Sequence, residues 1–320
     1  MNRRDFFKVM SRGALAGSAV GASWPIVADT GKFLTAPRFL EDSALTPAQV
    51  RTSIEHLMTS PPDREVYLKE FQKHQVSAQE LNLNQYLAKM HDFENAHRED
   101  IFVPGEQFEI LVSSFKRLDR VQGLVGHGNF NIVSFDDVLR YSRNYSAVGA
   151  FEVAEIDFIA SVFAADALDY GFFGSRVVGE LTSVVAQRDS VKVGNTGHYL
   201  FRGEAEKLYR KLHSDLGGSV VLTSGIRNIV KQTHLFLAKT IQSEGNLSRA
   251  SRSLAPPGHS FHGVGDFDVG KIGFGSKNFT EQFARTDEFH RLVELGYIDM
   301  RYPEDNLLGV RYEPWHIKVA

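Results

Sequence analysis

The spacing of apolar residues changes near Val191, and this change constrains the fold more than any other feature of the 320-residue chain. Before it, apolar residues recur at helical spacing in long blocks. After it, short apolar runs at 219–223 and 266–269 lie between glycines, as is typical of strands. Helical patterns intervene at 203–212, 228–242 and 280–295. The sequence therefore predicts an α+β fold, with a small antiparallel sheet and helices packed on it.

The part of the chain before this change is predicted to be helical. The pattern is helical from Leu45 to about Phe102, and Thr46-Pro47 is typical of a helix start. A glycine-rich break at 123–128 precedes a helix that begins at Ser134, and another runs from Val153 to Tyr170 and stops at Gly171. No spacing in these blocks indicates catalysis, so we expect them to pack against or position other elements.

The first 28 residues resemble a twin-arginine export signal. Arg3 and Arg4 are followed by Phe6, Phe7 and Lys8, and then by a small-residue run over 13–22. This run is too short and too rich in Gly, Ala and Ser for a spanning helix. The alternative is an ordinary amphipathic N-terminal helix. With the signal, we expect a soluble periplasmic protein that meets the twin-arginine translocase during export and has no stable membrane span in its mature form.

Composition excludes several classes of function. The chain has 36 basic and 39 acidic residues and a net charge of -3, so nothing indicates nucleic acid binding. It contains no cysteine, which removes disulfides, thiol nucleophiles and thiolate ligands together. Any metal ion must therefore be held by nitrogen and oxygen donors.

Two clusters carry residues that could together hold such an ion. In the first, His262 and Asp268 flank glycines that permit a tight turn. In the second, Glu313-Pro-Trp-His316, a straight strand would point Glu313 and His316 to opposite faces, so a shared role requires a bend at Pro314. The alternatives are a simple glycine turn and an aromatic-capped edge strand.

Taken together, these clusters meet the requirements of a catalytic zinc site. Two histidines and one aspartate supply three protein ligands and leave a position for water. Zinc lowers the pKa of that water to about 7. Glu313, which is not needed as a ligand, can then accept its proton and pass it to a leaving amine. This set of residues predicts a hydrolase.

Two further clusters contain arginines. Arg227 follows a predicted strand and Gly225, where it can hold a substrate carboxylate or an oxyanion. The alternative is a surface arginine that starts a helix. The loop over 194–202 carries His198 and Arg202, and we interpret it as structural rather than as a wall of the site.

In this order, the clusters resemble the zinc D-alanyl-D-alanine carboxypeptidases and dipeptidases of vancomycin resistance, whose relatives include phage endolysin peptidases and the hedgehog signalling domain. The family pattern is Ser-Gly-Tyr-Arg, then Ser-x-His-x-x-Gly leading to an Asp, then Glu-x-Trp-His. The resemblance covers roughly 191–320, with Ile226 in place of the aromatic residue. The matching residues are Ser224, Gly225, Arg227, Ser260, His262, Gly265, Asp268, Glu313, Trp315 and His316.

The resemblance implies a role for each of these side chains. His262, Asp268 and His316 would be zinc ligands and Glu313 the general base. Arg227 would bind substrate and stabilise the transition state, and Ser260 and Trp315 would also contact substrate.

One spacing departs from the family pattern. Five residues separate His262 from Asp268, where the family has six, so Asp266 is an alternative ligand. We favour Asp268 because Val269-Gly270 follows it as in the family. His259 is a neighbouring side chain that could mimic or support a ligand.

The resulting prediction is a zinc-dependent peptidase that hydrolyses D-amino-acid bonds of peptidoglycan stem peptides, foremost as a D-alanyl-D-alanine carboxypeptidase. We place an export signal over 1–28, a helical N-terminal region over 29–125 and the peptidase domain over 126–320. Alternatives on the same site are an endopeptidase and an L,D-carboxypeptidase. A non-catalytic wall-binding protein is a further alternative, and a helical adaptor would describe only the N-terminal segment.

Overall fold

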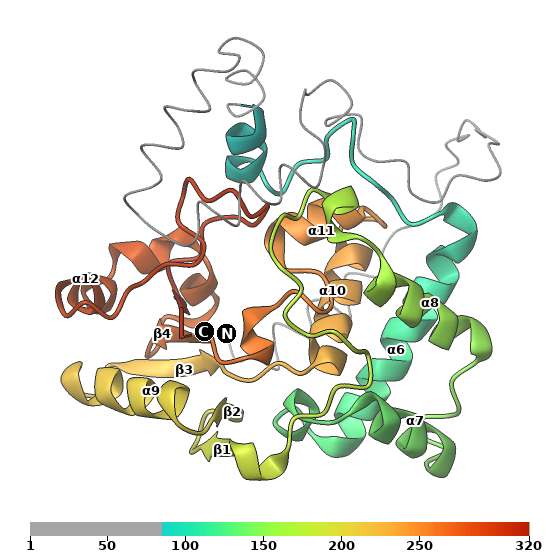
Figure 1. Cartoon of the computed structure of the whole chain (residues 1–320), viewed down its shortest axis with the longest axis horizontal. Coiled ribbons are helices and arrows are strands. Elements are labelled where there is room, and N and C mark those ends of the chain that lie inside the picture. Colours follow the sequence, from blue (N-terminus) through green and yellow to red (C-terminus); the bar gives the residue numbers. More distant parts are fainter. Residues whose placement is uncertain (1–84, 320) are drawn as a thin grey trace.

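The computed structural model describes residues 85–319, which form a helical half and a half built on small sheets (Figure 1). A hairpin, a three-stranded sheet and two outer helices make up the second half. The predicted α+β class is confirmed, and three of the helices precede the sheets as expected. The helices of the first half are α6 (Phe108–Val125), α7 (Phe135–Asn144), α8 (Val153–Ala164), α10 (Ile229–Gln242) and α11 (Leu247–Ser253).

The three-stranded sheet is antiparallel, with strand order β3-β4-β5. Its strands are β3 (Val220–Ser224), β4 (Phe267–Lys271) and β5 (His316–Ile317). The first two are the apolar runs that the sequence predicted as strands. In the observed register, Asp268 of the central strand lies opposite Ser224 on one side and His316 on the other. The sheet thus brings together residues nearly 100 positions apart in the sequence.

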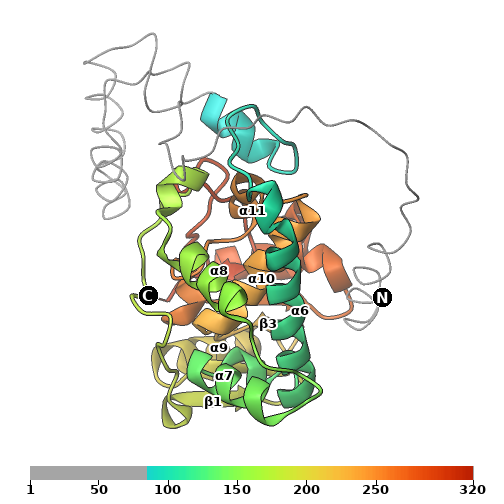
Figure 2. The same ribbon diagram turned by 90° about the vertical axis from the view of Figure 1, so that its right-hand side faces the viewer.

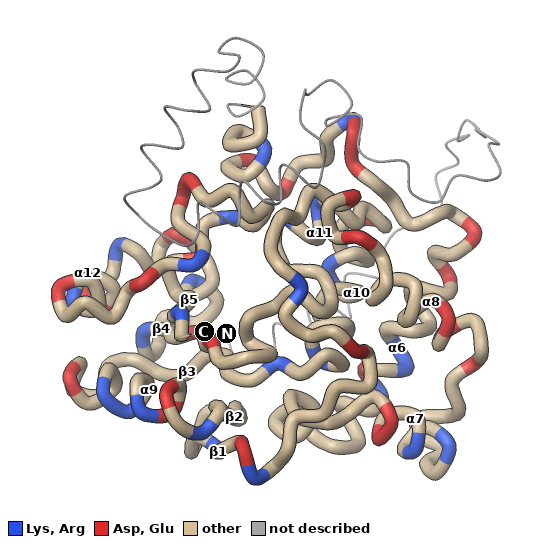
Figure 3. The backbone as a smooth tube through the Cα atoms, in the orientation of Figure 1, with Lys and Arg blue, Asp and Glu red and all other residues tan. Residues whose placement is uncertain are grey.

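The smaller sheet is a hairpin of β1 (Ser190–Val193) and β2 (His198–Phe201), and its turn lies in the cluster over 194–202. Arg202 follows β2, and its Nε donates to the Arg188 carbonyl at 3.0 Å. The hairpin agrees with the structural interpretation of this cluster. Helices α9 (Glu204–Asp215) and α12 (Asp287–Glu294) lie on the sheet half, and positive and negative residues are interspersed along both (Figure 3).

Apolar side chains form separate cores in the two halves. In the helical half α6 packs against both α8 and α10, and Figure 2 shows these helices beside one another. In the sheet half, Leu222, Phe267 and Ile317 pack with side chains of α9 and α12. The predicted domain boundary at 125/126 separates α6 from α10 in the sequence, although the two helices pack together. The boundary stays a prediction.

Local hydrogen bonds explain where helices begin. Ser134 caps α7 by accepting from the Asp137 backbone N–H, as its sequence predicts. Asn228 caps α10 in the same way through the Lys231 N–H. This cap places Arg227 at the junction between β3 and α10, directly beside the sheet.

Two predicted helices are interrupted. The helix expected over 153–170 ends at Ala164, and the 3-10 helix η3 (Ala167–Tyr170) follows, capped by Asp166 and ending at Gly171 with φ 76°. The helix expected over 280–295 divides into η7 (Glu281–Arg285) and α12. Side chains cause both breaks, because the Asp166 carboxylate and the Thr286 hydroxyl accept backbone N–H groups and start a new element.

The helical pattern predicted to continue to about Phe102 ends earlier in the structure. Residues 85–91 are helical, but the following residues form turns and extended chain. The buried Arg252 donates to the backbone carbonyls of Phe93 and Asn95 and to both oxygens of Asp100. These long-range contacts use carbonyl groups that a continuing helix would need for itself.

Expectations for the earlier part of the chain lie outside the described residues. They are the export signal, the helix start at Thr46 and most of the region from residue 29. Between residues 85 and 319, no helix combines the length and apolarity needed to cross a bilayer.

Candidate metal centre

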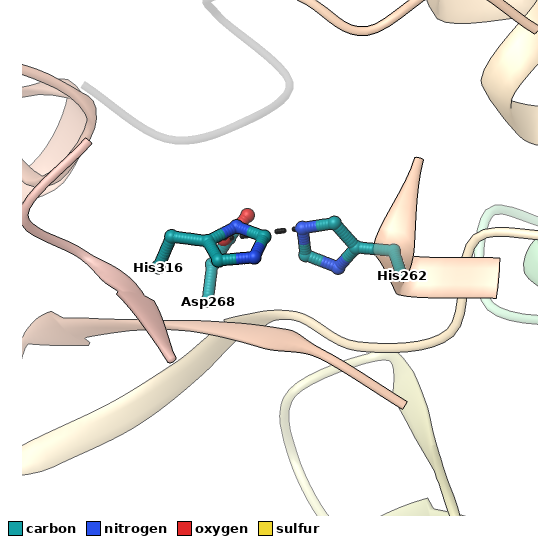
Figure 4. A group of neighbouring side chains, drawn as sticks. All are labelled: His262, Asp268 and His316. Atoms are coloured by element: carbon teal, nitrogen blue, oxygen red, sulfur yellow. Dashed lines mark ion pairs between the residues drawn. The ribbon is translucent and has the colours of Figure 1, made fainter. Parts of the chain in front are cut away.

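Three side chains from separate elements converge at the sheet. His262 lies on the 3-10 turn η5 (Phe261–Gly263), Asp268 on β4 and His316 on β5. All three are buried, and one ligand atom from each lies within 4.8 Å of the other two. Figure 4 shows the two imidazoles facing each other with the carboxylate beside them. These are the three residues that the sequence predicted as metal ligands.

The orientation of His262 is determined by a backbone carbonyl. Its Nδ1 lies 2.9 Å from the Gly225 oxygen, and because a carbonyl only accepts, the hydrogen must be on Nδ1. Nε2 therefore carries the lone pair, 3.2 Å from Asp268 Oδ1. Burial, and then the Arg227 charge, lower the pKa of His262, which favours the neutral imidazole that metals bind.

His316 is oriented through the opposite nitrogen. Nε2 donates to Asp266 Oδ2 at 2.9 Å, and Nδ1 lies 3.3 Å from Asp268 Oδ1. Burial works to lower the pKa of His316, but Asp266 and Asp268 outweigh it and raise that pKa to about 9. The surroundings of Nδ1 thus favour positive charge, from either a proton or a metal ion.

Asp268 directs its two oxygens to different groups. Oδ1 faces both imidazoles, whereas Oδ2 accepts from Arg227 Nη2 at 2.5 Å. Burial alone would raise the pKa of Asp268, but His262 and Arg227 lower it well below its usual value. The side chain is therefore a carboxylate, as a metal ligand must be.

The donor set fits a divalent cation. With both imidazoles neutral, His262 Nε2, His316 Nδ1 and Asp268 Oδ1 all present lone pairs to the same small volume. The last two of these atoms are buried and form no hydrogen bond. Two imidazoles and one carboxylate with an open position are typical of catalytic zinc sites. A cation at this point would relieve the repulsion between the lone pairs.

Glu313 reaches the same group from a bend. The His316 backbone N–H donates to the Glu313 carbonyl at 3.1 Å across Pro314 and Trp315, which is the bend that a shared role requires. Glu313 Oε2 lies 3.8 Å from His316 Nδ1, and its side chain is 13% exposed. Burial raises the pKa of Glu313, against the opposing charges of Arg311 and His316. Such a carboxylate suits a general base near neutral pH.

Arg227 is part of the centre rather than a surface residue. Its Nε donates to Ser224 Oγ at 2.8 Å, and its Nη2 holds Asp268. The side chain is 14% exposed, so it is not completely enclosed beside the candidate ligands. The sequence did not predict its pairing with Asp268.

The other predicted site residues lie further from the group. Ser260 is buried immediately before η5. Trp315 lies in the apolar core, edge-on to Phe279 and against Arg311. The substrate contact expected of Trp315 stays a prediction. His259 Nδ1 donates to the Gly174 carbonyl at 3.0 Å, and this side chain is outside the group.

Asp266, the alternative ligand, lies behind His316 and outside the three-residue group. It also pairs with the buried Arg301, whose Nε lies 2.6 Å from Asp266 Oδ2. The loop that carries Arg301 adds Tyr302, whose ring centre lies 5.0 Å from that of His316. No motif marks Arg301 or Tyr302 in the sequence, and only their place shortly before the Glu-Pro-Trp-His stretch links them to it.

The buried His–Asp–His group with an adjacent carboxylate matches the donor set of catalytic zinc sites. Residues 202–319 match the family model described as VanY, D-alanyl-D-alanine carboxypeptidase. This matched segment is less than half of the chain, and it contains the whole group and Glu313.

Three solved structures are similar to the chain. The LdcB LD-carboxypeptidase is 22% identical with a TM-score of 0.34, and the match covers 40% of this chain and 62% of that one. A variant of the vancomycin-resistance D,D-pentapeptidase VanY in complex with Zn(II) is 22% identical with a TM-score of 0.33, covering 44% and 85%. VanYB in complex with D-alanine-D-alanine is 24% identical with a TM-score of 0.34, covering 44% and 83%.

At this level of similarity the three structures bear on neither the residues nor the activity of this chain. No curated protein matches it.

Proposed function

We propose that the chain is a zinc-dependent D-alanyl-D-alanine carboxypeptidase that acts on peptidoglycan stem peptides. One observation carries this proposal: the lone pairs of His262, Asp268 and His316 converge beside an unliganded carboxylate, within the segment that matches the family. Zinc bound by these three residues would supply the Lewis acidity that makes a water nucleophilic at neutral pH.

Glu313 is the proposed general base. Its carboxylate lies beside the ligand atom of His316 without belonging to the ligand group, so it can reach a water at the centre. It accepts the proton of the attacking water and transfers it to the nitrogen of the leaving D-alanine as the peptide bond breaks. Burial raises the pKa of Glu313, which improves its match to this exchange.

Arg227 is the proposed electrophilic residue. Its guanidinium is fixed by Ser224 and Asp268 and remains partly exposed next to the ligands. A positive charge fixed in this way can stabilise the oxyanion that develops on the scissile carbonyl, or hold the terminal carboxylate of the substrate. Either contact would favour substrates with a free carboxyl end close to the cleaved bond.

The same centre would serve an endopeptidase or an L,D-carboxypeptidase, since the hydrolytic chemistry is shared. A non-catalytic wall-binding protein is less well supported, because it has no use for a buried carboxylate beside the metal ligands. We further propose export to the periplasm by the twin-arginine route, supported by Arg3-Arg4 and the small-residue run that follows them.

The test is digestion of a peptidoglycan pentapeptide by the purified chain, with mass analysis of the products. We expect one D-alanine to be released by the zinc-loaded protein and none after chelation. Release of a dipeptide, or cleavage of cross-linked material only, would identify one of the other peptidases instead. Absence of any cleavage by protein that carries stoichiometric zinc would contradict the proposal.

The metal ligands can be tested separately. His316→Ala removes one of three ligands and should abolish both zinc retention and cleavage. Full zinc content in this variant, measured by elemental analysis, would contradict the assignment of His316.

A further inference from the structure

Asp266 and Asp268 occupy the two sides of one imidazole. Asp266 directly precedes β4 and Asp268 is the second residue of that strand, and side chains two positions apart in extended chain lie on the same side. His316 lies opposite Asp268 in the neighbouring strand, and its ring reaches both carboxylates. Asp266 accepts from Nε2, whereas Asp268 faces Nδ1. Asp266 and Asp268, which the sequence offers as alternative metal ligands, thus contact different ring nitrogens of His316.

Asp266 is surrounded by donors. Besides His316, the Arg301 guanidinium contacts both of its oxygens, at 2.6 and 3.3 Å, and the Val319 backbone N–H donates to Oδ1 at 2.8 Å. Asp266 and Arg301 are 1% and 5% exposed. A buried carboxylate with this many donors has a fixed position. It can therefore hold His316 in one rotamer and one tautomer.

Arg301 also contacts the residue before His262, the other candidate histidine ligand. Its guanidinium carbon lies 3.4 Å from the centre of the Phe261 ring, and Phe261 is the residue before His262. The Asp266–Arg301 pair therefore touches η5, the start of β4 and the strand that carries His316. Arg301 also balances the negative charge of Asp266, as Arg227 does for Asp268.

We propose that Asp266 and Arg301 form a positioning pair that makes His316 an Nδ1 ligand. Asp266 accepts the hydrogen on Nε2, which leaves the lone pair on Nδ1 directed at His262 and Asp268. Carboxylates that accept the second N–H of a metal-bound histidine orient the ring and raise its basicity, and their loss weakens metal binding about 10- to 100-fold. This inference rests on the proposed metal site but not on the substrate.

The experiment measures zinc affinity by competition with a chromophoric chelator. Asp266→Ala removes the acceptor, and we expect affinity to fall about 10- to 100-fold while saturating zinc still binds at one ion per chain. Asp266→Asn is nearly isosteric and keeps an acceptor for Nε2–H, so its loss should be smaller. Asp299→Asn, which alters an exposed aspartate paired with Lys318, is the matched control and should bind zinc normally.

A second readout reports on the tautomer directly. Long-range proton–nitrogen spectra of zinc-loaded protein with labelled histidine should show His316 with hydrogen on Nε2 in the wild type. Thermal unfolding of each variant identifies any that fails to fold, and Asp266→Asn is expected to remain folded.

The outcomes separate this inference from the proposed function. Wild-type zinc affinity in both Asp266 variants, or hydrogen on Nδ1 of His316, would overturn the positioning role and leave the metal site intact. A wild-type chain that binds no zinc would instead contradict the proposed function. If Asp266 were itself a ligand, both variants would lose zinc as completely as His316→Ala.

Discussion

The histidines of the candidate centre are oriented through different nitrogens. His262 donates from Nδ1 to a backbone carbonyl, and His316 donates from Nε2 to Asp266. Each ring therefore directs its free lone pair toward Asp268. With these complementary tautomers, three residues from distant parts of the chain form a single ligand set. Glu313 lies beside this set but is not part of it.

Substitution of Glu313 by glutamine tests this separation at the residue scale. The amide has nearly the same shape but cannot accept the proton, so we expect kcat to fall by about 10²- to 10⁴-fold. Zinc content should not change, because Glu313 is not a ligand. Pentapeptide turnover and elemental analysis measure both quantities. Glu304→Gln, on the exposed part of the same loop, is the control and should keep full activity.

Near-normal turnover in Glu313→Gln would remove this residue from the mechanism.

At the scale of elements, the centre depends on a close approach between β2 and the end of β3. The Ile226 N–H donates to the Tyr199 carbonyl at 2.7 Å, directly after Gly225. A Cβ on Gly225 would lie 2.0 Å from that same carbonyl oxygen. The Gly225 carbonyl is also the acceptor for His262 Nδ1. The glycine thus permits the contact that positions one candidate ligand.

Gly225→Ala should therefore affect stability and metal binding together. The backbone at Tyr199 and the backbone at Gly225 are both fixed by their strands, so we expect the free energy of unfolding to fall by about 1–3 kcal/mol. Zinc binding should weaken as the Gly225 carbonyl moves away from His262. Urea unfolding and chelator competition measure these effects. Gly123→Ala is the control, because this exposed glycine lies inside α6 and its added Cβ would contact nothing within 4 Å. The control should gain about 0.5–1 kcal/mol.

An unchanged unfolding midpoint for Gly225→Ala would show that the β2–β3 approach is not required.

At the scale of the whole molecule, the helical half is held together around a buried histidine. His234 of α10 stacks on Phe115 of α6 at 4.9 Å between ring centres and meets the Phe130 ring edge-on. Its Nε2 lies 3.2 Å from Asp119 Oδ1. Burial lowers the pKa of His234 to about 4, and the nearby Asp119 offsets this effect only in part.

The stability of the whole chain should consequently depend on pH. In the unfolded chain this histidine gains its proton near pH 6.5, whereas in the folded chain it does so only near pH 4. Between these values the unfolded state binds more protons, so the free energy of unfolding falls as the pH is lowered. The contribution of His234 should reach at most about 3 kcal/mol. His234→Phe removes the titrating group and should flatten the dependence.

Chemical denaturation at several pH values between 4 and 7 gives the slope of the unfolding free energy against pH for the wild type and for His234→Phe. Their difference isolates His234 from other groups, even if the larger ring changes the absolute stability. Equal slopes in the wild type and the variant would contradict the prediction.

The described part of the predicted N-terminal helical region, from residue 85 onward, packs against the loop before His316. Tyr86 donates to the Asn306 carbonyl and accepts from the Gly309 N–H, and Phe93 stacks on Arg311. Arg311 in turn lies against Trp315, next to His316. This segment therefore packs against the loop that carries Arg301 and Glu313, although no catalytic motif lies within it.

The sequence by itself determined the features that depend on short-range physics. The strands at β3 and β4, the cap at Ser134 and the bend before His316 follow from periodicity and from side-chain bonds to nearby backbone. It also identified the residue types of the centre, because with no cysteine only histidine and carboxylate side chains could hold a metal.

Only the tertiary structure placed Asp268 rather than Asp266 in the three-residue group, and only it paired Arg227 with Asp268 and Asp266 with Arg301. It also placed Trp315 in the core and interrupted two predicted helices. These outcomes depend on the register of β3, β4 and β5 and on contacts between residues far apart in the sequence. Local pattern carries no information about such contacts, since they arise only when distant segments pack together.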